Sequence, residues 1–109
     1  MKVVYTQSAR QDLREIYEYI RYVLLEPLTA KRITETIQRE IRTLELFPES
    51  NPLYREEPWN SQGLRFLVVG NYLVFYKADN REEAVTVVRI LYGGRDIEKQ
   101  LEETVEHNP

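Results

Sequence analysis

The sequence contains no cysteine and only one histidine, His107, among its 109 residues. Without cysteine the chain has no disulfide framework, no thiolate zinc site and no cysteine nucleophile. A single histidine near the end gives little support to a multi-histidine metal centre or a serine–histidine triad. We therefore expect no metal and no cofactor, and any catalysis must rest on arginine, tyrosine or glutamate.

Long apolar runs are also missing. The strongest uncharged apolar stretch, residues 66–76, is far shorter than the ~20 residues that span a bilayer. The first apolar segment of the chain is too short for the core of a signal peptide, and charged residues follow it closely. We expect a cytoplasmic protein without membrane contact, and the length predicts a single domain over residues 1–109.

Positive charge is in slight deficit, because 15 Lys+Arg stand against 18 Asp+Glu, a formal net charge of -3. This total argues against a protein whose whole surface binds nucleic acid. The charge is uneven, since residues 96–109 hold five acidic residues against Lys99 and net −4, which leaves +1 for residues 1–95. Eleven of the cations are arginines and four are lysines, and arginine suits bidentate contacts to carboxylate or phosphate.

Two helices are predicted in the first half. The first is expected to start at Ser8, which stands at capping-box spacing from Gln11. Pro27 suits the first turn of the second helix, and Pro48 ends it. Together they form a helical hairpin. The apolar residues at helical spacing in the first helix are Ala9, Leu13, Ile16, Ile20 and Val23.

Strands are predicted at the start and through the second half of the chain. Val3–Tyr5 form a short first strand, and Leu64–Val69 and Tyr72–Lys77 flank a Gly70-Asn71 hairpin turn. Ala84–Tyr92 is rich in β-branched residues and forms the last strand.

The resulting order, β-α-α-β-β-β-α, predicts an α+β fold with the helical hairpin packed on a small, mostly antiparallel, twisted sheet. Asp96 is expected to cap an acidic C-terminal helix, which continues into a tail over residues 96–109. Residues 48–63 are rich in proline and form a long loop, which is either functional or simply pinned by Trp59.

The arginines of the sheet are the candidates for chemistry. Arg65 opens one strand, Arg89 lies inside an apolar one, and Arg95 follows it. By alternation Arg89 shares a face with Val87 and Leu91. Two interpretations stay open for Arg89: a structural ion pair with a helix carboxylate, for which Glu15 and Glu40 are candidates, or a basic site on the sheet.

Three segments, TQSARQDLREIYEYI, LRFLVVGNYLVFY and VTVVRILYGGRDIEKQL, occur in this order and together resemble the RelE/ParE superfamily of bacterial toxins. The resemblance covers roughly residues 3–101 and implies the toxin of a type II toxin–antitoxin pair. In this family a segment of the cognate antitoxin folds over the toxin as a helix or an added strand. The residues that the resemblance places against the antitoxin are Leu13, Tyr17, Ile20 and Leu24 of the first helix.

Two activities occur in the superfamily. ParE-type members bind and poison DNA gyrase, and RILYGGRD resembles their final strand. RelE-type members are metal-independent endoribonucleases that cut messenger RNA on the ribosome, for which the resemblance implies catalytic roles for Arg65, Arg89, Tyr92 and Arg95. The lysines that RelE-type members carry ahead of the strand arginine are missing here, because residues 54–62 hold only Arg55. We therefore expect a gyrase inhibitor, with the endoribonuclease as the alternative.

Overall fold

The computed structural model describes residues 1–94 and 96–104. The chain folds as β1 (Lys2–Tyr5), α1 (Gln7–Glu18), a π-helical turn (Tyr19–Val23), α2 (Pro27–Arg42) and a 3-10 turn (Thr43–Glu45). The second half supplies β2 (Arg65–Val69), β3 (Tyr72–Asp79), β4 (Ala84–Tyr92) and α3 (Ile97–Glu102). This order and the α+β class confirm the sequence-based prediction, and the predicted tail residues 105–109 lie outside the described residues.

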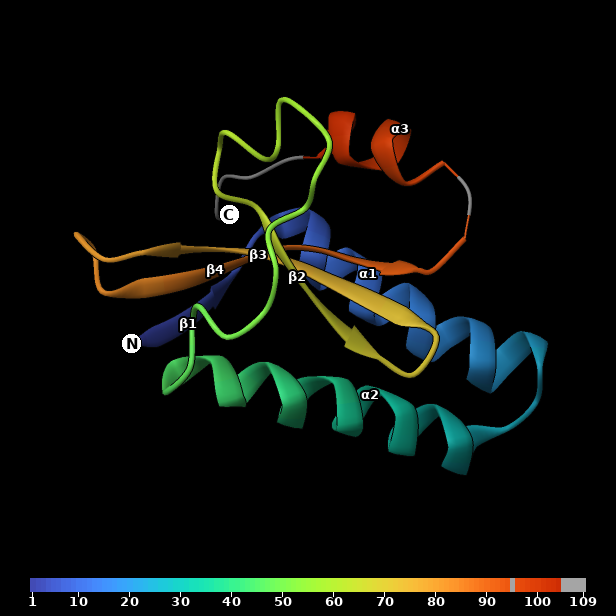
Figure 1. Ribbon diagram of the computed structural model, residues 1–109. Coiled ribbons are helices and arrows are strands. Elements are labelled where there is room, and N and C mark those ends of the chain that lie inside the picture. Colours follow the sequence, from blue (N-terminus) through green and yellow to red (C-terminus); the bar gives the residue numbers. More distant parts are fainter. Residues whose placement is uncertain (95, 105–109) are drawn as a thin grey trace.

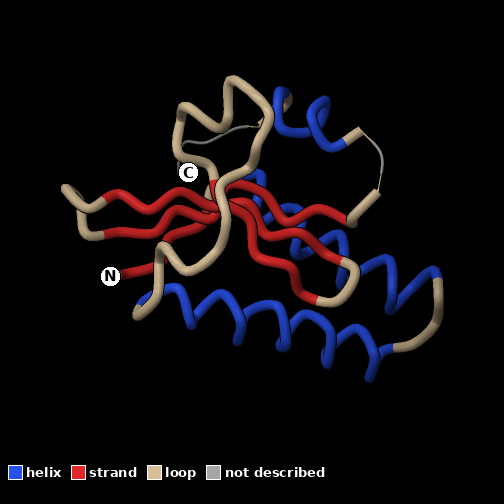
Figure 2. The backbone as a smooth tube through the Cα atoms, in the orientation of Figure 1, coloured by secondary structure: helices blue, strands red, loops and turns tan. Residues whose placement is uncertain are grey.

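The four strands form one mixed sheet in the order β1-β4-β3-β2 (Figure 1). β1 runs parallel to β4, whereas β4, β3 and β2 are joined antiparallel. Gly70 has a φ of 58° in the β2–β3 turn, as a tight hairpin connection requires. The hairpin and the long loop over residues 46–64 are easily followed in Figure 2.

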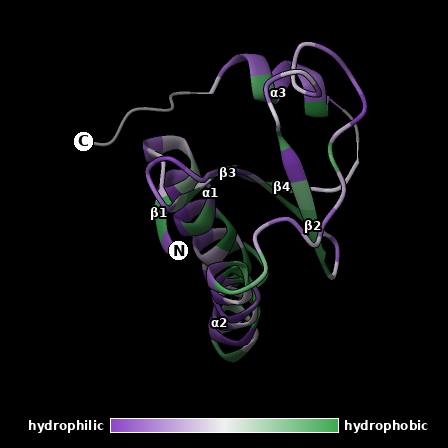
Figure 3. Ribbon diagram, turned by 60° about the vertical axis from the view of Figure 1, so that its left-hand side comes forward, coloured by the Kyte–Doolittle hydropathy of each residue, from purple (hydrophilic) through white to green (hydrophobic). Residues whose placement is uncertain are grey.

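Two apolar clusters occupy the two faces of the sheet. The first joins α1 and α2 to the sheet through residues such as Ala9, Ile37, Ile41 and Val74. The second lies under α3 and the long loop, so that the sheet is covered on both sides, with α2 below and α3 above in Figure 1. Figure 3 shows hydrophobic and hydrophilic residues alternating along α1 and α2, as expected for helices with one buried face. The residues of the second cluster are Trp59, Leu64, Phe75, Val88, Leu91, Ile97 and Leu101.

The cap of α1 differs from the predicted one. Thr6, not Ser8, is the N-cap, and its hydroxyl accepts a hydrogen bond from the backbone N–H of Ala9 at 3.0 Å. The same hydroxyl donates to the carbonyl of Val88 at 2.7 Å. The short-range spacing of Ser8 and Gln11 could not reveal this second bond, which comes from a residue 82 positions away. At the other end of the chain Asp96 does stand at the N-cap of α3, but its side chain makes no capping bond.

A β-bulge in β4 changes the predicted faces. Phe75 of β3 pairs with Arg89, while the next residue, Tyr76, pairs with Val87, which leaves Val88 as the extra residue. Val87 therefore packs in the first cluster and Leu91 in the second. The expectation that Arg89 shares a face with Val87 is wrong, because strict alternation fails at a bulge.

Thr6 gives a test of how the first helix is anchored to the sheet. Thr6→Val keeps the shape of this fully buried side chain but removes both hydroxyl bonds, so the free energy of unfolding should fall by about 1–3 kcal/mol. Urea denaturation would measure it. Thr36→Val is the matched control, since the Thr36 hydroxyl is exposed and bonds only within its own helix. Equal losses in the two variants would contradict the anchoring role.

Candidate functional site

Arg89 is held in a clamp between three elements. Its Nε and Nη2 donate to the two carboxylate oxygens of Asp12 in α1 at 2.7 and 2.8 Å. Its Nη1 donates to the carbonyl of Gln100 in α3 at 2.6 Å. Both side chains of the ion pair are largely buried, at 13% and 11% exposed. These hydrogen bonds to the Asp12 carboxylate are the main reason that the pKa of Arg89 is raised.

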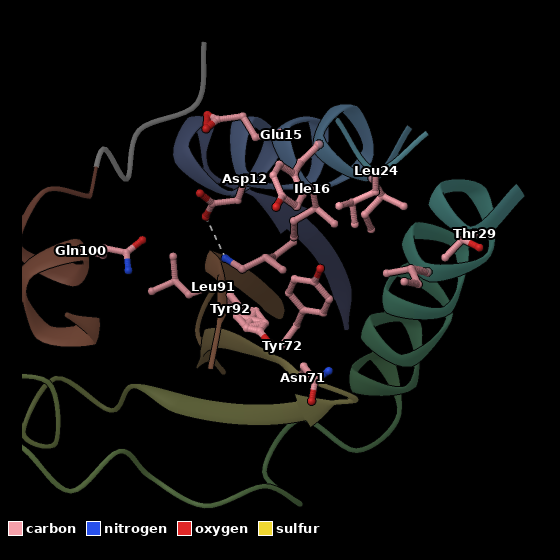
Figure 4. Close-up of a pocket in the computed structure, with 14 residues that line it drawn as sticks. Asp12, Glu15, Ile16, Leu24, Thr29, Asn71, Tyr72, Leu91, Tyr92 and Gln100 are labelled. Carbon is pink, nitrogen blue, oxygen red and sulfur yellow. Dashed lines mark hydrogen bonds between the residues drawn. The ribbon is translucent and has the colours of Figure 1, made fainter. Parts of the chain in front are cut away.

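Asp12 also accepts a hydrogen bond from the edge of β4, beyond the point at which its pairing with β1 ends at Val87. The backbone N–H of Ile90 donates to Asp12 Oδ2 at 2.9 Å, the bond drawn dashed in Figure 4. One carboxylate thus satisfies a guanidinium and a strand-edge amide. Of the two interpretations left open for Arg89, the structure shows the ion pair with a helix carboxylate, and the partner is Asp12 rather than the candidates Glu15 and Glu40. The signal was present, because Asp12 lies three residues after Ala9 and four before Ile16, on the apolar stripe of the helix.

Arg65 lies at the opposite edge of the sheet, held by the long loop. Its Nη1 donates to the carbonyl of Asn51 at 2.7 Å, and its Nη2 lies 3.6 Å from the carboxylate of Glu49. Arg65 pairs with Tyr76 and Arg89 with Phe75, which are adjacent residues of β3 in different core clusters. The two arginines therefore lie on opposite faces of the sheet and do not form one site.

Tyr92, at the end of β4, is 60% exposed and packs edge-on against Tyr72 with ring centroids 5.6 Å apart. Burial is the main reason that the pKa of Tyr72 is raised, with smaller contributions from Tyr92 and Tyr19. Within residues 1–94 and 96–104, neither Arg65 nor Arg89 forms a hydrogen bond to Tyr92. Arg95 lies outside the described residues.

The two tyrosines form one wall of a groove of about 630 Å³ between the end of β4, the β2–β3 turn and the hairpin of α1 and α2 (Figure 4). Ile16, Ile20 and Leu24 form the apolar wall on the helical side, and Asp12 and Glu15 line the same groove. We name this cavity the inner groove.

A second groove, of about 380 Å³, lies on the other flank of α1 and is lined by Leu13, Tyr17, Arg10 and Arg14 together with Tyr5, Thr34 and Gln38. We name it the outer groove. The four residues predicted to contact an antitoxin are therefore divided. Leu13 and Tyr17 line the outer groove, and Ile20 and Leu24 line the inner one.

The long loop is joined to α3 by Tyr54. Its ring packs edge-on against Trp59, Phe66 and Phe75, and its hydroxyl donates to Glu98 Oε1 at 2.9 Å. Burial first, and then this hydrogen bond, raises the pKa of Tyr54 to about 12. The loop is therefore an ordered cover on the second cluster, pinned by an aromatic group as well as by Trp59.

Metal and membrane signatures are both absent from the part of the chain that the structure describes. Residues 1–94 and 96–104 contain no cluster of three metal-ligating side chains. Within the same residues no helix is both long and apolar enough to cross a bilayer.

Comparison with known proteins gives a family match over most of the chain. The model of the ParE toxin of the type II toxin–antitoxin system parDE matches residues 3–97. A search of curated proteins found no significant match.

Solved structures give the same fold. A chain of the chromosomal ParDE toxin–antitoxin system from P. aeruginosa aligns with a TM-score of 0.69 at 21% identity, covering 84% of this chain and 95% of that one. A chain of the RelBE2 toxin–antitoxin complex from Mycobacterium tuberculosis aligns with a TM-score of 0.55 at 20% identity, with the same coverage of each.

The clamp predicts a large penalty for losing its carboxylate. Asp12→Ala leaves a nearly buried guanidinium and the Ile90 amide without their partner, so the free energy of unfolding should fall by about 3–5 kcal/mol. Glu35→Ala is the control, because its 4.0 Å pair with Lys31 is exposed and should contribute less than about 0.5 kcal/mol. Denaturant titration would measure both variants.

The double variant Asp12→Ala/Arg89→Met should lose less unfolding free energy than the two single variants lose together, because it leaves no buried charge without a partner. If Asp12→Ala were no more destabilising than Glu35→Ala, the clamp would not carry the stability assigned to it.

The raised pKa of Tyr54 predicts that its contribution to stability is lost at high pH. Its pKa is raised from 10.0 to about 12 in the folded protein, so its stabilising effect is complete below pH 10 and is lost as the pH rises through about 12. The stability difference between the wild type and Tyr54→Phe should therefore narrow across this window, and the tyrosinate absorbance titration should lose its component near 12. Tyr22→Phe, at a 63% exposed position, is the control and should retain that component. A Tyr54→Phe curve that still contains it would refute the assignment.

Proposed function

Because this chain belongs to the ParE toxin family of type II toxin–antitoxin systems, we propose that it inhibits DNA gyrase by direct binding and is neutralised by a cognate antitoxin. The proposed activity is a binding function without a catalytic centre or cofactor. In this proposal the toxin acts through surfaces that bind other proteins. The contacts of Arg65 and Arg89 within the protein support such a binding function.

The observation that carries the proposal is that the guanidinium of Arg89 is already bound by other groups of the protein. An endoribonuclease of this fold would need a cation directed at the charge that develops on the reacting phosphate. The guanidinium of Arg89 instead donates to both oxygens of Asp12 and to the carbonyl of Gln100. Freeing it for a phosphate would break a largely buried ion pair, which costs several kcal/mol.

The cover on the second cluster supports the same conclusion. Ile97 and Leu101 of α3 are 6% and 5% exposed and pack with Phe75, Val88 and Leu91. This face of the sheet is therefore filled by the protein's own side chains. A substrate strand would have to displace α3 before reaching it.

We place the antitoxin on α1 and the π-helical turn that follows it, where the grooves are lined by Leu13, Tyr17, Ile20 and Leu24. Both solved relatives come from toxin–antitoxin systems, which supports a cognate antitoxin as partner. An amphipathic segment that lays apolar side chains into grooves beside a helix is a common recognition mode.

One observation favours the alternative, a ribosome-dependent endoribonuclease acting on messenger RNA. Tyr92 is 60% exposed at the end of β4, where a phenol could reach a substrate. Arg65 is also partly exposed, at 21% of its side chain. In the part of the chain that the structure describes, Arg65 bonds to the long loop and Tyr92 packs on Tyr72, with no hydrogen bond between them, so a shared catalytic site requires a rearrangement.

The two activities are separated by parallel assays on the purified protein. We expect it to inhibit supercoiling by DNA gyrase and to leave messenger RNA intact during translation in a cell-free system. Arg65→Ala should inhibit gyrase within about threefold of the wild type, since truncating a side chain outside a binding hot spot has little effect.

Arg55→Ala is the matched control, because the Arg55 side chain is 93% exposed and lies in the same part of the chain. Cuts in the messenger that disappear in Arg65→Ala but persist in Arg55→Ala would replace the gyrase proposal by the endoribonuclease.

A further inference from the structure

The end of the helical hairpin, where the chain passes from the π-helical turn into α2, carries apolar side chains that the protein leaves exposed. Leu25 and Leu28 are 76% and 82% exposed, and Tyr22 and Val23 are also mostly exposed. These four residues line neither the inner nor the outer groove. We name them the hairpin tip. Figure 1 shows the tip projecting beyond the β2–β3 turn, so that the sheet does not cover it.

The backbone of the hairpin tip is unusual. Leu25 has a φ of 58°, in the left-handed region that favours glycine over residues with a side chain. The turn before it, Tyr19–Val23, is π-helical, a rare form that is frequent at functional sites. Because the Leu25 side chain is exposed, little burial offsets its backbone strain. Glycine would suit the fold better here, so a leucine at this position indicates a contact with something outside the chain.

The charges beside the hairpin tip are balanced. Arg21 and Glu26 are the only charged residues between positions 19 and 30 of the sequence, so this segment has no net charge. Within residues 1–94 and 96–104, neither of them forms an ion pair. The guanidinium of Arg21 lies 5.3 Å from the centroid of the Tyr22 ring, and Glu26 accepts a hydrogen bond from the Thr29 hydroxyl at 3.4 Å. Both side chains therefore lie at the edge of the tip and keep their charges.

An apolar surface with one cation and one anion at its edge is complementary to itself. In a dimer with twofold symmetry the same patch of each copy faces the other, and each contact between two different residues occurs twice. Arg21 of one copy can then meet Glu26 of the second copy, and the reverse, while the leucines are buried between them. An anionic membrane or a nucleic acid would require an excess of positive charge instead. The balance of charge therefore favours a second copy of this chain.

We propose that the hairpin tip is the interface of a symmetric homodimer of this protein, with Leu25 and Leu28 at its centre and pairs of Arg21 and Glu26 at its rim. An apolar centre with a polar rim is the usual arrangement of a protein interface. The four apolar residues of each copy are far fewer than the roughly 20–30 residues of a standard interface. The dimer is therefore weak and dissociates on dilution. The inference goes beyond the proposed function, because it concerns the protein without its target.

Analytical ultracentrifugation of the full-length protein over a range of concentrations tests the dimer. The mass of the wild type should rise towards twice that of the chain at high concentration and return to that of the monomer on dilution. Leu25→Ser/Leu28→Ser should weaken association at least about tenfold, as expected for removing the centre of an interface. Leu46→Ser/Phe47→Ser is the matched control, since it removes two exposed apolar side chains at the other end of α2, and should associate within about twofold of the wild type.

A charge exchange tests the symmetry of the contact. Arg21→Glu and Glu26→Arg should each weaken association at least about threefold, because each places like charges together at both ends of the interface. The double variant Arg21→Glu/Glu26→Arg should return to within about twofold of the wild type, since it restores both pairs with their signs reversed. Lys31→Glu/Glu35→Lys exchanges an exposed pair within α2 and should leave association unchanged. Circular dichroism would confirm that these variants are folded.

Leu25→Gly separates a role in contact from a role in the fold. Glycine adopts a φ of 58° without strain, so the variant should unfold at a temperature no lower than that of the wild type when both are diluted to monomers. The same variant should associate at least about fivefold more weakly, because it lacks a side chain at the centre of the interface. A leucine kept for the fold would give the opposite result, a lower unfolding temperature with unchanged association.

Several results would overturn the proposal: a wild type that stays monomeric at every concentration, equal losses in the two serine double variants, or a charge-exchanged variant no better than its single parents. A monomeric wild type that binds phosphatidylcholine vesicles, and loses this binding in Leu25→Ser/Leu28→Ser, would make the tip a membrane contact instead. None of these measurements includes gyrase. A protein that dimerises but leaves gyrase active would therefore reject the proposed target alone, and a monomer that inhibits gyrase would reject the dimer alone.

Discussion

The bidentate pair of Asp12 and Arg89 is the contact on which the arrangement of the other elements depends. It joins α1 to the centre of the sheet, and the third branch of the same guanidinium reaches the backbone of α3. Because Asp12 also accepts the Ile90 amide, it closes the part of β4 that the short β1 leaves uncovered. An unpaired strand edge in that position would be open to another chain. One carboxylate thus fixes two helices and protects an edge.

This constraint determines which surfaces remain for partners. With Arg89 committed to Asp12 and the second cluster filled by α3, the sheet presents its own side chains rather than an open basic platform. The flanks of α1 are different, since each carries a groove with exposed polar groups. Under the proposed function, a toxin built in this way acts through recognition by its helical hairpin, and Arg89 has a structural role.

The sequence predicted the order and type of the elements because these follow from local periodicity. Alternating and helical patterns, Pro27 and the Gly70-Asn71 turn all act within a few residues of one another. The details of the candidate site depend instead on contacts between distant positions. Thr6 caps α1 while bonding Val88, Asp12 finds Arg89 across 77 positions, and the bulge at Val88 moves Val87 to the other face. No local pattern in the sequence encodes these three features, although the carboxylate of Asp12 on an apolar stripe was a readable sign that it has a buried partner.

The division of Leu13 and Tyr17 from Ile20 and Leu24 has a consequence for the proposed antitoxin. Leu13 and Tyr17 lie in α1, whereas Ile20 lies in the π-helical turn and Leu24 directly after it. The two pairs line different cavities, so a rigid partner that fits one groove cannot also fill the other. A flexible segment that folds as it binds can pass around the helix and use both. The grooves also differ in charge, because Glu15 lines the inner one, where Asp12 is already paired with Arg89, and Arg10 and Arg14 line the outer one. A segment that is acidic where it meets the outer groove and neutral or basic where it meets the inner one would be complementary to both, and the reverse orientation would place like charges together at each end. The charge pattern of α1 thus selects the direction in which a wrapping chain can lie, a property that the net charge of -3 conceals.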